Sequence, residues 1–302
     1  MALKRSIDSE THSRWALNAQ LLILDSLMVE TPWKVGEVAF HGGTSLHLSW
    51  RSPRFSEDLD FLISRQVSDI GAAMGRVARR VSEGLMAIDP GLRFEVRDKT
   101  ADAQRMLVFH CVVTHPEVDG RAMVKAKFWR VDREYLDQYP VRLRQQMAID
   151  EVVSRVQHPV PAATLSTAFC DKLTAFATRP RLKWRDVFDL WWIGTQTNEP
   201  LDFATVVRQY QHNVSAYQTV ESRSVAAALR VFLASDRDEV IALAHKDLRP
   251  FLSESVWQRY WPQGIAEMVD YTRSVLARIA DAIDAPESVV GDDLDLKRPF
   301  GA

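Results

Sequence analysis

The chain of 302 residues has few of the features that mark several protein classes: it has two cysteines, no excess of one charge and no long apolar run. Cys111 and Cys170 cannot cross-link a chain of this size, and both lie in apolar segments, so we predict buried thiols in a reducing compartment. The formal net charge of −2 excludes a broadly cationic surface for nucleic acid, although it leaves room for a local basic patch.

Membrane, secretion and zinc signals are also missing. The run from Leu21 to Val29 contains Asp25 and is much shorter than the ~20 apolar residues that span a bilayer. The N-terminal residues lead into a polar stretch and not into the apolar core of a signal peptide. The eight histidines lack the spacing of a zinc site, and no Gly-x-Ser-x-Gly motif indicates a hydrolase. We therefore expect a soluble, cytoplasmic protein without a membrane partner.

The hydrophobic pattern divides the chain into two regions. Residues 1–160 mix helical periodicity with strand-like runs, whereas helical periodicity dominates after Pro159 and Pro161. The expected strands are residues 38–40, 59–63, 92–96, 106–113 and 122–129, and the expected helices of this region are residues 10–29, 44–50 and 69–86. Because the chain exceeds one typical domain of ~100–200 residues, we predict an α+β domain over residues 1–160 and a helical domain over residues 161–302.

The most specific motif lies in the first region, where a short strand runs into Gly-Gly-Thr-Ser and is followed by Asp58 and Asp60. Two glycines let the backbone approach a ligand, and the first N–H groups of a helix that begins at Thr44 favour phosphate oxygens. Asp58 and Asp60 share a strand face and offer oxygen ligands to a hard cation such as Mg²⁺. The predicted phosphate-binding residues are Gly42, Gly43, Thr44 and Ser45.

Each half of this motif also has an ordinary interpretation. A Gly-Gly pair before a helix is often only a turn, and an Asp-x-Asp pair often lies on the surface. Here the two acids adjoin the apolar residues 61–63, which we expect to be buried, and unpaired carboxylates are costly in such a place. The combination therefore favours a site for a nucleoside triphosphate and its metal.

In these residues the sequence resembles the AbiEii/AbiGii (MenT-type) nucleotidyltransferase toxins of the polymerase-β-type superfamily. The superfamily signature is Gly-Gly or Gly-Ser, a spacer and Asp-x-Asp, and the subfamily adds a helical lysine and an Asp-x-x-Asp. The matching segments are Gly42-Gly43-Thr44-Ser45-Leu46, Arg54-Phe55-Ser56-Glu57-Asp58-Leu59-Asp60-Phe61, Asp171-Lys172-Leu173-Thr174-Ala175 and Arg185-Asp186-Val187-Phe188-Asp189-Leu190. The resemblance covers residues 36–195. It implies an N-terminal polymerase-β-type lobe with a mixed sheet and flanking helices, and a C-terminal helical lobe that completes the active site.

The resemblance also implies residue roles. The implied catalytic residues are Asp58, Asp60, Lys172 and Asp186. Asp58 and Asp60 would hold Mg²⁺, with Mn²⁺ as an alternative, and Lys172 would contact phosphates of the NTP substrate. From the residues alone, Lys172 could instead reach solvent or pair with Asp171 or Asp189. Asp186 and Asp189 share a helix face, and the resemblance implies that Asp189 supports helix packing or orients Lys172.

One strand departs from the superfamily pattern. Many members carry a third carboxylate on a later strand, but this strand reads Met123-Val124-Lys125-Ala126-Lys127-Phe128-Trp129. Three explanations stay open: the acid comes from elsewhere, Lys127 replaces it and lowers the demand for metal, or the chemistry is weakened. The candidates for an acid from elsewhere are Glu95, Asp98 and Asp132.

Ser56 lies two residues before Asp58 and is a candidate regulatory residue. A phosphate or nucleotide added to its hydroxyl would crowd the carboxylates with negative charge and shut the site. The ordinary alternative is a loop serine that caps a turn.

A compact basic cluster precedes the Asp-x-x-Asp motif. Arg181, Lys183 and Arg185 surround Trp184, and such a cluster can hold RNA phosphates and stack a base, or it can be a solvated face. The resemblance implies transfer of NMP from an NTP to RNA, with the tRNA 3′ end as the leading acceptor and translation as the target. It also implies a toxin–antitoxin or abortive-infection role in phage defence, with a cognate antitoxin encoded nearby. The alternatives are a protein or small-molecule acceptor, and a weakened module that only binds NTP or a partner.

Overall fold

The structure, a computed structural model, describes residues 5–31, 33–34, 36–146, 158–179, 181, 183–196, 203–217 and 225–284. These residues form two units, an α+β unit and a helical unit, with a boundary between Ala163 and Thr164. The short segment Ser52–Arg54 belongs by its contacts to the helical unit, although the residues on either side of it belong to the α+β unit.

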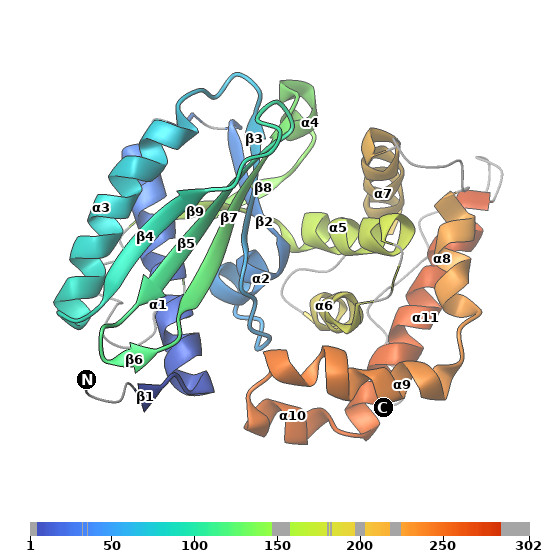
Figure 1. Ribbon diagram of the computed structural model, residues 1–302. Coiled ribbons are helices and arrows are strands. Elements are labelled where there is room, and N and C mark those ends of the chain that lie inside the picture. Colours follow the sequence, from blue (N-terminus) through green and yellow to red (C-terminus); the bar gives the residue numbers. More distant parts are fainter. Residues whose placement is uncertain are drawn as a thin grey trace. The chain divides into compact units, whose positions relative to one another are not determined.

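The α+β unit is built on a mixed sheet, as predicted, and this sheet has seven strands where the sequence predicted five (Figure 1). The strands, given in their order across the sheet, are β4 (Arg93–Asp98), β5 (Met106–Thr114), β7 (Ala122–Val131), β3 (Leu59–Ser64), β2 (Val38–His41), β9 (Val160–Ala163) and β8 (Val141–Arg144). The central strand β3 runs parallel to β7 and antiparallel to β2. A separate parallel pair joins β1 (Arg5–Ser6) to β6 (Val118–Asp119).

The side chains of β3 and β7 alternate between an apolar face of the sheet and a face that carries charged residues. Leu59, Phe61 and Ile63 belong to the main hydrophobic core, together with Phe128 of β7. Because side chains alternate along a strand, Asp60 points to the opposite face. The core face is covered by α1 (Ser9–Glu30) and α3 (Ile70–Ile88), which lie side by side in Figure 1.

Two short helices complete the described part of this unit: α2 (Gly42–Trp50) follows β2 directly, and α4 (Arg133–Asp137) follows β7. The second face of the sheet carries a much smaller apolar cluster that includes Leu62 of β3 and Leu136 of α4. Cys111 is buried in the main core and Cys170 is buried in the helical unit, and both are free thiols, as predicted.

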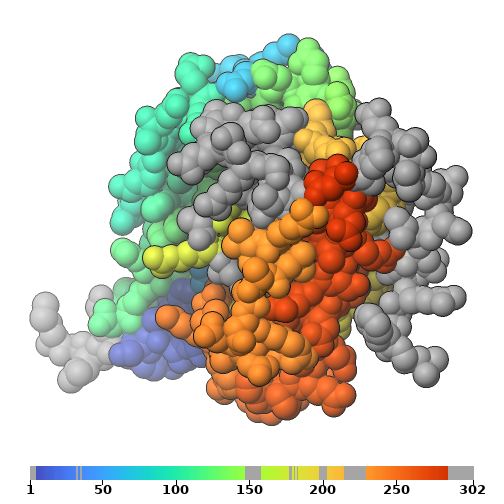
Figure 2. Space-filling model, turned by 90° about the vertical axis from the view of Figure 1, so that its right-hand side faces the viewer, coloured from blue at the N-terminus to red at the C-terminus, as the bar shows by residue number. Residues whose placement is uncertain are grey.

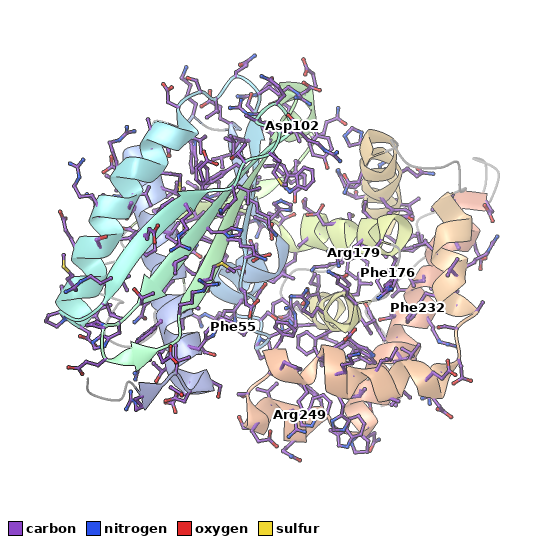
Figure 3. The ribbon with its side chains drawn as sticks, viewed as in Figure 1. Phe55, Asp102, Phe176, Arg179, Phe232 and Arg249 are labelled. Carbon is purple, nitrogen blue, oxygen red and sulfur yellow. The ribbon has the colours of Figure 1, made fainter. Side chains whose placement is uncertain are left out.

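The helical unit contains α5 (Leu165–Thr178), α6 (Trp184–Gly194), α7 (Phe203–Tyr217), α8 (Val225–Leu233), α9 (Arg237–Asp247), η2 (Arg249–Phe251), α10 (Glu254–Tyr260) and α11 (Gln263–Asp284). Helix α6 buries Trp184, Val187 and Phe188, and α11 packs against α6, α8 and α9. Phe176 of α5 meets Phe232 of α8 edge to face at 5.2 Å (Figure 3). On the surface shown in Figure 2, the orange segment of α9 and α10 adjoins the red helix α11.

No helix within the described ranges combines the length and the apolar character needed to cross a membrane.

Candidate active site

Asp58, Asp60 and Lys127 form a charged cluster on the face of the sheet opposite α1 and α3. The ammonium Nζ of Lys127 lies 2.6 Å from Oδ2 of Asp58 and 3.5 Å from Oδ1 of Asp60. The parallel register of β3 and β7 places Asp60 directly beside Lys127. The three side chains are 31%, 25% and 26% exposed, so the cluster is half-buried but open to a ligand.

The electrostatics of Lys127 follow from these contacts. Burial alone lowers the pKa of its ammonium, but the charges of Asp60 and Asp58 outweigh burial and raise the pKa above the usual lysine value. Lys127 is therefore a fixed positive charge between the two predicted metal ligands at neutral pH.

This geometry argues against the first of the three explanations for the missing acid, an acid that comes from elsewhere. Glu95 and Asp98 lie on β4, which β5 and β7 separate from β3, and each has its own partner there. Asp132 pairs with Arg65 at 2.9 Å. Among the described residues, the position beside Asp58 and Asp60 is held by Lys127.

Gly42 fits closely against the second acid. Its φ is +78°, and a Cβ added to it would lie only 3.1 Å from Oδ2 of Asp60. Position 42 therefore needs glycine both for its backbone conformation and for the close approach of the carboxylate. Helix α2 begins at Gly42, two residues earlier than predicted, because Gly42 and Gly43 form its first turn and not a separate loop.

The two hydroxyls after the glycines differ in what they contact. Thr44 donates its hydroxyl hydrogen to the backbone carbonyl of Asp58, which ties the start of α2 to the segment before β3. This hydrogen bond gives Thr44 a positioning role, and the phosphate contact predicted for its hydroxyl stays a prediction. Ser45 is buried, and its Oγ has no hydrogen-bond partner among the described residues.

The donor set fits one hard divalent cation. Two carboxylates on one strand face supply oxygen ligands, and phosphate and water would supply the remainder of the about six that Mg²⁺ prefers. No group of three or more acids, histidines or cysteines placed to hold a metal occurs within the described ranges. A bound ion would therefore take two ligands from Asp58 and Asp60 and the rest from water or from the nucleotide.

A second charged cluster lies inside the helical unit, between α5, α6 and the segment Ser52–Arg54. The ammonium Nζ of Lys172 lies 2.7 Å from Oδ2 of Asp189 and 3.1 Å from Oδ1 of Asp186. Arg54 grips Asp189 with both Nε and Nη2, each at 2.7 Å. Arg179 pairs with the other oxygen of Asp186, and Figure 3 shows it beside α6.

Asp189 is the fully buried centre of this second cluster. Burial by itself raises the pKa of the carboxyl, but the charges of Arg54 and Lys172 prevail and hold the pKa below its ordinary value. Asp189 thus stays ionised and fixes Lys172, which agrees with the expectation that it orients that lysine.

The predicted RNA-binding residues lie at the start of α6. Arg181 and Lys183 are exposed, whereas Arg185 is partly buried and its guanidinium lies 4.5 Å from the ring centroid of Phe251 in η2. Trp184 is fully buried, so the only aromatic side chain of the predicted cluster does not stack a base. Contact of the three basic residues with phosphates stays a prediction.

Ser56 is only 8% exposed. Its carbonyl oxygen accepts a hydrogen bond of 2.8 Å from Nε2 of Gln20 in α1. Modification of Ser56 would require this segment to open.

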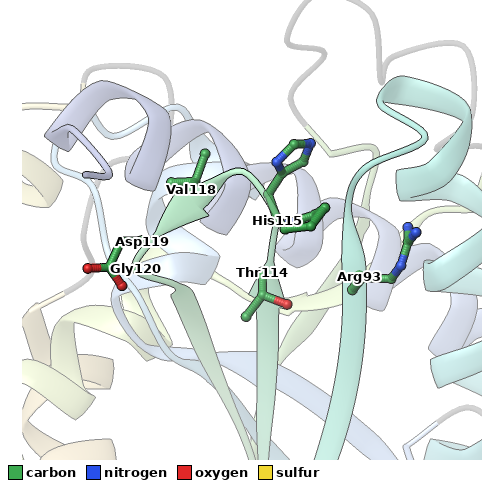
Figure 4. A pocket seen from close by; sticks show the side chains of 7 residues that line it. Arg93, Thr114, His115, Val118, Asp119 and Gly120 are labelled. Atoms are coloured by element: carbon green, nitrogen blue, oxygen red, sulfur yellow. The ribbon is translucent and has the colours of Figure 1, made fainter. Parts of the chain in front are cut away.

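A cavity of about 320 Å³ lies at the other end of the sheet, lined by Arg93, Thr114, His115, Pro116, Val118, Asp119 and Gly120 (Figure 4). Thr114 is six residues along β5 from Val108, the register partner of Lys127, which corresponds to about 20 Å of strand. The cavity therefore belongs to a different part of the α+β unit from the acids.

Comparisons with known proteins agree with this geometry. The fold is that of nucleotidyltransferases: MenT4, a nucleotidyltransferase toxin from Mycobacterium tuberculosis H37Rv, aligns at a TM-score of 0.59 and 19% identity, covering 92% of this chain and 86% of MenT4. JHP933 from Helicobacter pylori aligns at a TM-score of 0.53 and 16% identity, covering 92% of this chain and 95% of that protein. No curated protein matches the sequence.

Residues 34–285 match the family described as "Nucleotidyl transferase AbiEii toxin, Type IV TA system". The match spans most of the chain, so the protein belongs to this family. It is a nucleotidyltransferase toxin of a type IV toxin–antitoxin system, as the resemblance implied.

Proposed function

We propose that this toxin transfers NMP from an NTP to RNA, with the 3′ end of a tRNA as acceptor, in a reaction that depends on Mg²⁺. The observation that carries the proposal is the packing of Gly42 against Asp60, which joins the first turn of α2 to the acid pair of β3. Loss of usable tRNA would stop translation, and we propose that this protects a population against phage while an antitoxin encoded nearby restrains the toxin.

The first turn of α2 supports binding of the triphosphate. Gly42 and Gly43 expose backbone N–H groups at a helix N-terminus, where phosphate oxygens are favoured. Asp58 and Asp60 would hold the divalent ion, which when bound neutralises charge on the phosphates and on the leaving pyrophosphate.

The reaction is an in-line displacement at the α-phosphorus. The oxygen of the acceptor hydroxyl forms a bond to the α-phosphorus, the bond to the oxygen that bridges to the β-phosphate breaks, and pyrophosphate leaves with both bonding electrons. The proton of the hydroxyl passes to a carboxylate and then to solvent. Positioning and charge neutralisation supply most of the rate enhancement in such a reaction.

The helical unit supplies the proposed lysine. Among the described residues, Asp186 and Asp189 take two of the three N–H donors of Lys172, which leaves one for a phosphate oxygen. Asp186 is the second proposed catalytic residue of this unit, since it holds both Lys172 and Arg179.

The test is incubation of the purified chain with total tRNA, Mg²⁺ and each α-labelled NTP in turn. We expect label on tRNA with wild type and none with Asp58→Ala. The matched control is Glu83→Ala, which removes an exposed carboxylate from α3, on the opposite face of the sheet. Expression of the same three proteins should arrest growth except in the Asp58→Ala strain.

Other outcomes would redirect the proposal. Label on a protein or small molecule in place of RNA would overturn the RNA acceptor and keep the chemistry. No label with any NTP, together with growth arrest by Asp58→Ala, would identify a binding module without catalysis.

A further inference from the structure

Lys127 occupies the position where a further ligand for a second cation would lie. Its ammonium is 2.6 Å from Oδ2 of Asp58 and 3.5 Å from Oδ1 of Asp60, so one oxygen of each carboxylate already faces a positive charge. We infer that Lys127 takes the place of one divalent cation and that this chain works with a single divalent ion, an inference that rests on the proposed nucleotidyl transfer.

The backbone makes this arrangement a fixed feature of the sheet. Lys127 lies on β7, an interior strand paired on both sides, and its register partner on β3 is Asp60 itself. A lysine on such a strand can bend its side chain but cannot leave the neighbourhood of the carboxylates.

The charge balance around the acids favours one ion. Two carboxylates carry −2 and the ammonium returns the sum to −1, so one divalent ion brings the cluster to +1 before the nucleotide binds. A second divalent ion would lie within a few ångströms of both the first ion and the ammonium, without a third carboxylate to offset the repulsion.

The remaining oxygens can still serve one ion. Oδ2 of Asp60 is directed at Gly42, where the first turn of α2 would hold the triphosphate. Asp58 and Asp60 would hold one ion through oxygens that the ammonium of Lys127, on β7, does not occupy. The positive charge that a second ion would supply comes from Lys127 and is present without any metal.

The test counts bound Mn²⁺ by electron paramagnetic resonance during titration of the full chain with metal alone. Wild type should bind one Mn²⁺ per chain, and Asp58→Asn should abolish this binding. Lys127→Met, which removes the charge and keeps the length, should bind Mn²⁺ about tenfold more tightly. Lys127→Arg should behave like wild type, and Lys127→Asp should bind two ions.

The matched control is Lys246→Met, which removes the same charge from an exposed lysine of α9 and should leave the Mn²⁺ affinity nearly unchanged. Two ions bound to wild type, or equal affinity of wild type and Lys127→Met, would overturn the inference. If thermal melting shows that Lys127→Asp is unfolded, the inference is tested by the Mn²⁺ affinities of Lys127→Met and Lys127→Arg alone. A tighter affinity of Lys127→Met than of Lys127→Arg supports it, and equal affinities overturn it. The labelled-NTP assay is an independent measurement. An absence of transfer by wild type would contradict the proposed function, whereas the number of bound Mn²⁺ ions is measured without any reaction.

Discussion

Arg54 and Asp189 form a two-point ion pair inside the helical unit, with Nε and Nη2 each 2.7 Å from a carboxylate oxygen. Their side chains are 2% and 0% exposed. A buried pair of this kind does not guarantee stability, but the removal of one partner leaves an uncompensated charge in the interior.

Arg54→Met should therefore destabilise the helical unit by about 3–5 kcal/mol, because Asp189 would keep only Lys172 as a cationic partner among the described residues. Urea unfolding followed by tryptophan fluorescence measures this change. The control is Arg237→Met: Arg237 grips Asp270 with the same two-point geometry, both at 2.8 Å, but on the surface, and its replacement should change stability little. Equal effects of the two substitutions would contradict the importance of burial.

The carboxylate of Asp189 should also make the stability of the fold depend on pH in the acid range. The pKa of Asp189 is below its ordinary value of 3.8, so its contribution to stability is complete above that value and is lost as the pH falls through the folded-state pKa. We expect the melting temperature of wild type to exceed that of Asp189→Asn near neutral pH. The difference should shrink as the pH falls below 3.8 and Asp189 takes up its proton. A difference that does not change with pH would contradict this assignment.

The sequence predicts five of the seven strands of the main sheet, because strand alternation is a local property, and it misses the short strands β8 and β9. It also marks Lys127 as unusual. It does not show that Lys127 touches both acids, since that arrangement depends on the register of two parallel strands far apart in the chain.

The contacts of Arg54 were even less predictable from the sequence. It belongs to a loop without periodicity, and its partner Asp189 lies 135 residues away. The only local signal is its place four residues before Asp58, within the motif. Burial of a loop arginine is a property of the packed helical unit. The ion pair between Arg179 and Asp186, by contrast, joins residues that are close in sequence, and such a pairing could be expected from the sequence.

Gly42→Ala should impair nucleotidyl transfer more than folding. The positive φ costs an alanine about 1–2 kcal/mol, and the added Cβ would push against Oδ2 of Asp60, 3.1 Å away. A carboxylate displaced by even part of an ångström should lower kcat/KM by about 100-fold. The control is Gly75→Ala in α3, where an added Cβ has no neighbour within 4 Å and should stabilise the helix by about 1 kcal/mol. Retained transfer by Gly42→Ala would show that the acid pair tolerates movement.

Neutralising the two exposed basic residues before α6 should weaken RNA binding and leave the chemistry intact. Arg181→Gln combined with Lys183→Gln should raise the KM for tRNA about tenfold with little change in kcat or in the KM for NTP, because phosphate contacts position RNA without reacting. The slope of log affinity against log salt should become shallower by about 0.7 for each RNA phosphate that the variant no longer neutralises. Initial rates at several salt concentrations measure both effects.

The matched control for this double variant is Arg79→Gln with Arg80→Gln, two exposed arginines of α3 on the other face of the sheet. This control removes the same total charge, so any general electrostatic attraction of RNA changes equally in the two proteins. An equal rise in the KM for tRNA in the two double variants would show that net charge, and not the position of Arg181 and Lys183, causes the rise. An unchanged KM in both would mean that the acceptor binds elsewhere, and a protein or small-molecule acceptor, which needs no basic surface, would then explain the chemistry better.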